Sequence, residues 1–147
     1  MAWIYDAMDK VRDRINTLAA ARAADTVAIV PYGQERKTVP AAKSFWVTLH
    51  PLSDNEMAEP GEAYVAEYVI GVTVWIKTAA RSESVVSGLS TRVADVRSLL
   101  RYSDLGGWGR VVLAGDEFGG GEYIEGEDSD NIYGYQFELT VKKQYTS

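Results

Sequence analysis

The chain has no cysteine, one histidine and four prolines among its 147 residues. The lack of cysteine excludes disulfides, thiolate nucleophiles and cysteine-ligated metals. The single histidine, His50, likewise excludes His-rich zinc sites and histidine pairs, and its position before Pro51 favours a structural role. No apolar run reaches the roughly 18 residues that a membrane span requires, so we expect no contact with a membrane.

Sequence motifs of the common enzyme classes are also missing. There is no G-x-S-x-G nucleophile turn and no G-x-x-x-x-G-K-[ST] phosphate loop. Three consecutive glycines, 119–121, stand between acidic residues, and a phosphate cradle needs basic neighbours, so they predict a flexible loop. The segment EGEDSDN at 125–131 has no glycine at the position that a calcium-binding EF-hand loop requires. We therefore expect no catalytic residue, no cofactor and no metal.

Acidic residues outnumber basic ones, 21 to 15, which gives a net charge of −6. Residues 1–50 carry a net charge of +2, whereas residues 51–147 carry −8. The most uneven stretch is 115–131, with seven acidic residues and no basic one. This balance argues against a protein that adheres to nucleic acid, because such proteins usually present a basic face.

The hydrophobic periodicity divides the chain into helices and strands. Apolar residues at three- and four-residue steps predict helices over 2–23 and from Ser82 or Ser84 to about Tyr102. Alternation and β-branched runs predict strands over 26–31, 43–50, 64–78, 110–114 and 132–144. The order α-β-β-β-α-β-β predicts a single α+β domain over 1–147, with a mainly antiparallel sheet and two amphipathic helices packed on one face.

Turns and loops are predicted where the periodicity stops. Pro51 is expected to end its strand because proline cannot donate to a β-ladder, and Gly71 is expected to mark a bulge or bend in the long strand 64–78. The acidic segments 52–62 and 115–131 are predicted to project from the sheet and to be ordered mainly by neighbours in an assembly.

The aromatic and charged residues supply candidate contacts. Trp46 and Trp75 fall on the less apolar faces of their strands, so they belong either to a core covered on both sides or to a protein interface. Arg92, Arg97 and Arg101 lie in the later turns of the second helix, on a solvated face or in an interface ion pair. The candidate interface residues are Trp46, Trp75, Arg92, Arg97, Glu125, Glu127, Asp128 and Asp130.

Three explanations remain for the carboxylates gathered between Asp116 and Asp130. The segment can hold a cation, line a passage for DNA, or dock on a basic surface of a partner. The calcium-loop spacing is wrong for the first explanation. Docking is favoured slightly over the passage, because a mobile, glycine-rich loop would tend to obstruct a channel.

The whole-chain pattern resembles the tail terminator, or tail completion, proteins of long-tailed bacteriophages. Three segments carry the resemblance: the opening amphipathic helix AWIYDAMDKVRDRINTLAAA, the long strand YVAEYVIGVTVWIKT followed by the helix SESVVSGLSTRVADVRSLL, and the terminal strand IYGYQFELTVKKQY. The family has no sharp catalytic motif, so no functional residue is transferred from it to this chain.

The resemblance implies a non-enzymatic virion protein of the tail or neck that is assembled in the host cytoplasm. It would form a homohexameric ring that caps the tail tube, stops its polymerisation and meets the head–tail connector or stopper protein. DNA would pass through the ring without sequence-specific binding. Alternatives remain open: another head–tail joining protein, a small acidic α+β binding module with or without calcium, and an enzyme that uses carboxylates alone.

Overall fold

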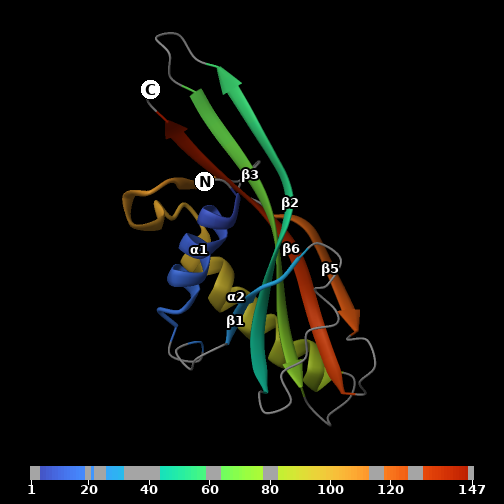
Figure 1. Cartoon of the computed structure of the whole chain (residues 1–147). Coiled ribbons are helices and arrows are strands. Elements are labelled where there is room, and N and C mark those ends of the chain that lie inside the picture. The colour runs from blue at the N-terminus through green and yellow to red at the C-terminus, as the bar shows by residue number, and fades with distance from the viewer. Residues whose placement is uncertain are drawn as a thin grey trace.

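Two helices lie on one side of a six-stranded sheet in the part of the chain that the computed structural model describes (Figure 1). That part comprises residues 4–18, 21, 26–31, 44–58, 64–77, 83–112, 118–125 and 131–145. Its elements are α1 (Ile4–Ile15), β1 (Val27–Ile29), β2 (Phe45–Ala58), β3 (Tyr64–Lys77), α2 (Glu83–Leu100), the 3₁₀ turn η2 (Leu105–Gly107), β4 (Arg110–Val112), β5 (Gly119–Glu125) and β6 (Ile132–Tyr145).

The sheet has the strand order β1-β2-β3-β6-β4, and β5 also pairs with β6. β1 runs parallel to β2, and the other pairs are antiparallel. The expected α+β class, with a mainly antiparallel sheet and two helices packed on it, is confirmed. The main core lies between the helices and the sheet, where Met8, Val11, Leu89 and Val96 meet Val72 and other strand residues.

The first helix is shorter than the predicted range 2–23, part of which lies outside the described residues. α1 ends at Ile15, and Asn16 to Leu18 form a turn. The Thr17 hydroxyl donates to the carbonyl of Arg14 at 2.7 Å. Such a local bond offers the backbone an alternative to the helix, which is why threonine is favoured near helix ends.

The prediction that Pro51 ends its strand is wrong. β2 continues to Ala58, so residues 52–58 belong to the sheet and not to a projecting loop, while 59–62 lie outside the described residues. The register between β2 and β3 shifts between Pro51 and Ser53. A β-bulge at this point accommodates the proline, because the ladder is already interrupted there. The irregularity that was expected at Gly71 of β3 therefore lies in β2, between Pro51 and Ser53.

The prediction of a flexible loop at 119–121 is also wrong, because these glycines begin β5, which pairs with β6. A Cβ at Gly121 would overlap the hydroxyl of Tyr135. Glycine therefore permits a close approach between β5 and the aromatic ring on its neighbour. Of the acidic segment 115–131, residues 115–117 and 126–130 lie outside the described residues.

A second, smaller core covers the face of the sheet that points away from the helices. It contains Trp46, Trp75, Ile124 and Ile132, each at most 8% exposed. On the helix side, β2, β3 and β6 continue past both helices toward the end of the sheet near the C-terminus (Figure 1). Among the described residues, no helix is long and apolar enough to cross a membrane.

Candidate functional site

A groove of about 330 Å³ runs between α2 and the edge of the sheet formed by β5 and β6. One stripe of α2 forms its first wall, with positions that recur at three- and four-residue steps. Two tyrosines from the sheet form the other wall. The lining residues are Ser90, Val93, Ala94, Arg97, Ser98, Arg101, Tyr123 and Tyr135.

Arg97 lies in this groove with its guanidinium carbon close to three aromatic rings. The distances to the ring centroids are 5.5 Å for Phe118, 4.9 Å for Tyr135 and 4.8 Å for Phe137. An aromatic ring attracts a guanidinium that lies over its face, through the cation–π interaction. Phe137 is fully buried, and the Phe118 ring contacts it edge-to-face with 5.0 Å between the ring centroids. These packed rings hold the arginine side chain in one position.

The polar groups of Arg97 are only partly used. One Nη donates to the Tyr135 hydroxyl at 3.1 Å, and the Nε is buried with no hydrogen-bond partner. No ion pair of Arg97 is found among the described residues, although a guanidinium has five N–H donors. A buried donor without a partner costs free energy, so the Nε of Arg97 is a position at which a hydrogen-bond acceptor would be stabilising.

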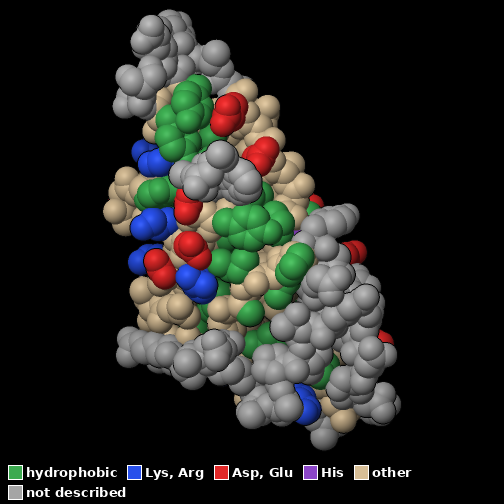
Figure 2. Space-filling view, in the orientation of Figure 1, with side chains coloured by type: hydrophobic (Ala, Val, Ile, Leu, Met, Phe, Trp, Pro, Cys, Tyr) green, Lys and Arg blue, Asp and Glu red, His purple; other side chains and the backbone are tan. Residues whose placement is uncertain are grey.

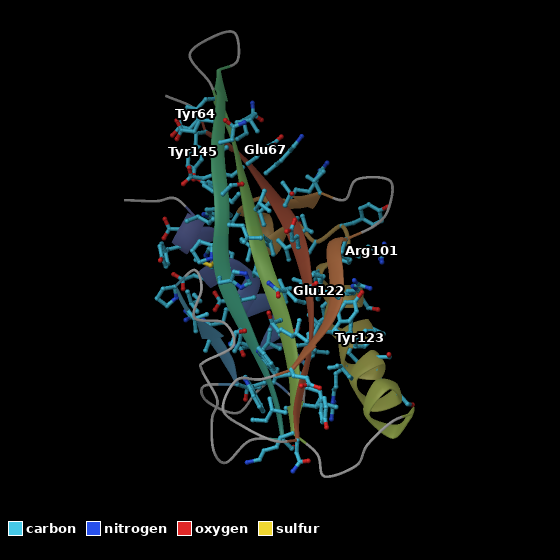
Figure 3. The ribbon with its side chains drawn as sticks, turned by 90° about the vertical axis from the view of Figure 1, so that its right-hand side faces the viewer. Tyr64, Glu67, Arg101, Glu122, Tyr123 and Tyr145 are labelled. Atoms are coloured by element: carbon cyan, nitrogen blue, oxygen red, sulfur yellow. The ribbon has the colours of Figure 1, made fainter. Side chains whose placement is uncertain are left out.

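Arg101 and Tyr123 complete the open side of the groove. The Arg101 guanidinium lies 5.2 Å from the Phe118 ring, and the Arg101 side chain is exposed. Tyr123 is 56% exposed, contacts Tyr135 edge-to-face at 4.9 Å, and shares a 3.2 Å hydrogen bond with the Ser90 hydroxyl. Figure 3 shows Arg101 and Tyr123 on the same side of the molecule, beside α2.

The groove is chemically suited to a carboxylate. It presents two guanidinium groups, flanked by serine and tyrosine hydroxyls, and none of the described residues that line it is acidic. A guanidinium matches a carboxylate with two parallel N–H···O bonds, which is the geometry that favours arginine over lysine in such sites. Among the described residues there is no group of three His, Asp or Glu side chains that could hold a metal ion.

The structure separates Arg92 and Arg97, the two arginines among the candidate interface residues. Arg92 lies over the ring of Phe45, on β2, at 5.0 Å, whereas Arg97 faces β5 and β6. A spacing of five residues places two side chains on different faces of a helix. Arg101 shares the later turns of the helix with the two candidate arginines, and its four-residue spacing from Arg97 is the signal that pairs them in the groove. Tyr123 is a lining residue that the sequence pattern does not single out.

The acidic candidates are only partly placed. Glu125 is exposed at the end of β5, two residues after Tyr123 and therefore on the same face of the strand. Glu122 lies on the opposite face, where it lines a shallow hollow with Gln136 and Glu138. The candidates Glu127, Asp128 and Asp130 lie outside the described residues.

Trp46 and Trp75 are directly paired across β2 and β3. Their rings stack at 6.1 Å, and each is only 1% exposed in the single chain. The Trp75 indole donates to the Thr48 hydroxyl at 3.0 Å, while the Trp46 indole nitrogen has no partner. Of the two alternatives left by the sequence, burial favours the core covered on both sides, and an interface role for the pair stays a prediction.

A second aromatic group lies at the far end of the sheet. Tyr64 and Tyr145 stack at 4.9 Å, and Tyr68 stacks on Trp108 at 6.3 Å. The Lys143 ammonium lies 4.7 Å from the Trp108 ring and donates to the Trp108 carbonyl. Figure 2 shows hydrophobic side chains at this end, and charges of both signs interspersed over α1. The contacts fix the part of the sheet that the helices do not cover.

Comparisons with known proteins give no functional assignment. No family model and no curated protein matches the chain. One solved structure aligns with 98% of this chain and 96% of its own length, at 18% sequence identity and a TM-score of 0.49.

Proposed function

We propose that this protein is a structural subunit of a bacteriophage tail, a terminator that assembles into a homohexameric ring. The ring caps the tail tube, stops its polymerisation and presents a surface to the head–tail connector or stopper protein. DNA passes through it without sequence-specific binding. The protein is not an enzyme, and it acts in the tail or neck of the virion.

The observation that carries the proposal is Arg97 in its groove, because its Nε is buried without a hydrogen-bond partner and it forms no ion pair among the described residues. In a ring, one surface of each subunit meets a different surface of the next, so the two surfaces must be complementary rather than alike. The groove supplies a basic surface, and β5 leads into a segment whose remaining charges are acidic. The α+β fold, in the element order that the resemblance implies, further supports the proposal.

The test is to measure the mass of the purified protein and its effect on tail tubes. Native mass spectrometry should give a species of six times 16.2 kDa, and electron micrographs should show rings with a central hole. Added to polymerising tube protein from the same phage, the chain should shorten the tubes and remain at one end. Bovine serum albumin at equal concentration is the control.

Two results would count against the assignment. A chain that stays monomeric at every concentration, and leaves tube length unchanged, contradicts the terminator function. A ring that binds the connector but ignores tubes indicates instead another head–tail joining protein of the neck.

A further inference from the structure

The second half of β2 lies at an outer edge of the sheet. β1 is on this side of β2 but pairs only with residues 47–49, so within the described part of the chain no strand accompanies β2 from Pro51 to Ala58. Residues 53–56 are exposed there, and we call them the β2 edge. In Figure 1 the upper half of β2 has no other labelled element on its outer side. An exposed edge strand is a template on which a further strand can pair.

The backbone groups of Asp54 and Glu56 point outward from the sheet. In an antiparallel pair, opposite residues alternate between those that exchange backbone hydrogen bonds and those that turn away from each other. The N–H of Lys77 in β3 donates to the carbonyl of Ser44, so the odd-numbered residues of β3 turn toward β2. The bulge lies in β2 and leaves this alternation in β3 intact. Asp54 and Glu56 lie opposite even-numbered residues, so their N–H and C=O groups turn away from β3.

The same two residues make the β2 edge acidic. Opposite residues of a strand pair share a face, so the side chains of Asp54 and Glu56 lie on the helix side of the sheet, with those of Tyr68 and Ala66. They are exposed and two positions apart, which is the repeat at which a neighbouring strand presents its own side chains to one face. A strand that matches this edge therefore carries lysine or arginine at every second position.

The charge of the β2 edge opposes pairing with the same strand of a second copy. An antiparallel pair centred on Asn55 would place Asp54 of one copy opposite Glu56 of the other, and like charges directly opposite are destabilising. At the other edge of the sheet, the N–H of Val111 in β4 already donates to the carbonyl of Ser103 at 2.8 Å. The β2 edge therefore fits a basic segment of a different protein better than a second copy.

We propose that the β2 edge binds an extended segment of a partner protein, with lysine or arginine at alternate positions, as an additional antiparallel strand. Backbone hydrogen bonds to the outward groups of β2 supply the affinity, and the two carboxylates select the basic sequence. The inference rests on the proposed function only for the identity of the partner, which is then the tube or connector protein that the ring meets.

A peptide of alternating threonine and lysine, seven residues long, is the probe. Fluorescence anisotropy of the labelled peptide with the full chain should show saturable binding that weakens as salt screens the charges. In the antiparallel arrangement, a lysine opposite Asp54 or Glu56 exchanges backbone hydrogen bonds with it, whereas the threonine amides face away. Methylation of the lysine amide nitrogens should therefore weaken binding at least about tenfold, and methylation of the threonine amide nitrogens should not.

Variants of the chain separate the backbone contact from the charge. Glu56→Pro removes an outward N–H, and it should fold because Pro51 already occupies an outward position of β2. It should weaken peptide binding about tenfold while circular dichroism stays unchanged. Glu56→Gln keeps the N–H but removes the charge, so it should lower the salt dependence of binding. Glu138→Gln removes an exposed carboxylate from β6, away from this edge, and should bind as the wild type does.

The outcomes distinguish this inference from the proposed function. A wild-type chain that does not bind the peptide, or that binds both methylated peptides equally, overturns the strand addition, and rings that still form leave the proposed function standing. Loss of subunit association in Glu56→Pro, measured by mass photometry, would assign the β2 edge to a contact between copies and overturn the basic partner. A monomeric wild type that binds the peptide through the β2 edge overturns the ring alone.

Discussion

Tyr68 is a buried tyrosine whose surroundings change its pKa. Its side chain is 3% exposed, and its hydroxyl lies 3.0 Å from that of Tyr145. Burial, followed by this hydrogen bond, raises the pKa of Tyr68 well above its ordinary value of 10.0. The neutral form is favoured in the fold because a phenolate there would lose its hydration.

This raised pKa predicts how stability depends on pH. The unfolded chain releases the Tyr68 proton near pH 10, whereas the folded chain retains it, so the folded state binds more protons above that pH. The stabilisation is complete below about pH 10 and is lost as pH rises further, with a slope of at most about 1.4 kcal/mol per pH unit.

Urea unfolding between pH 9 and 11 measures the effect. Tyr68→Phe should lower this slope relative to the wild type, because phenylalanine has no hydroxyl proton to release. An identical slope in Tyr68→Phe and the wild type would show that Tyr68 does not titrate differently in the two states.

Among the elements, the β2–β3 pair depends on one close approach. His50 and Gly71 are cross-strand partners, and the buried imidazole fills the space where a Cβ on Gly71 would be. The same imidazole contacts the side-chain amide of Gln136 at 3.3 Å. Gly71 thus leaves room for the His50 side chain on the face of the sheet that points away from the helices. This agrees with the structural role expected for His50.

Substitution of this glycine should therefore disrupt the strand pair. Gly71→Ala is expected to lower the free energy of unfolding by roughly 1–3 kcal/mol, because the new methyl group overlaps the imidazole. Gly88→Ala in α2 is the control, since a Cβ at this position would lie 4.0 Å from Ile76 Cδ1, an ordinary contact, and alanine favours the helix. A Gly71→Ala protein as stable as the wild type would show that His50 moves aside without cost.

At the scale of the whole molecule, the sheet separates two hydrophobic cores, one on each of its faces. The helices cover one face, and the Trp46–Trp75 cluster occupies the other. Both indoles are buried without a partner chain, so their packing contributes to the stability of the single subunit. This separates them from the α2 groove, at which Arg101 and Tyr123 are exposed.

Truncation of the tryptophan pair should consequently affect folding. Trp75→Ala is expected to lower the free energy of unfolding by about 3–5 kcal/mol, through loss of the buried ring and its bond to Thr48. Chemical denaturation of the monomer measures this loss, with exposed Tyr5→Ala as the control. Unchanged monomer stability with lost ring formation would instead place the pair at the subunit contact.

The sequence by itself determined the α+β class, the helix positions and the three strands that cross the centre of the sheet. Those features follow from periodicity, which is local. Leu89, Val93, Val96 and Leu100 recur at helical steps, and every second residue of β3 from Tyr64 to Ile76 is apolar. Burial of one apolar face suffices to select each element, whatever it packs against.

Only the tertiary structure decided the continuation of β2 past Pro51, the strand formed by the glycines of β5, and the groove around Arg97. Each depends on a partner distant in sequence: β3 for the bulge, and Tyr135 for the close approach of Gly121. Arg97, in α2, likewise contacts the rings of Phe118, Tyr135 and Phe137, which lie about 20 to 40 positions later in the sequence. Local patterns record which side chains are buried, but the pairing of distant strands decides which of them meet.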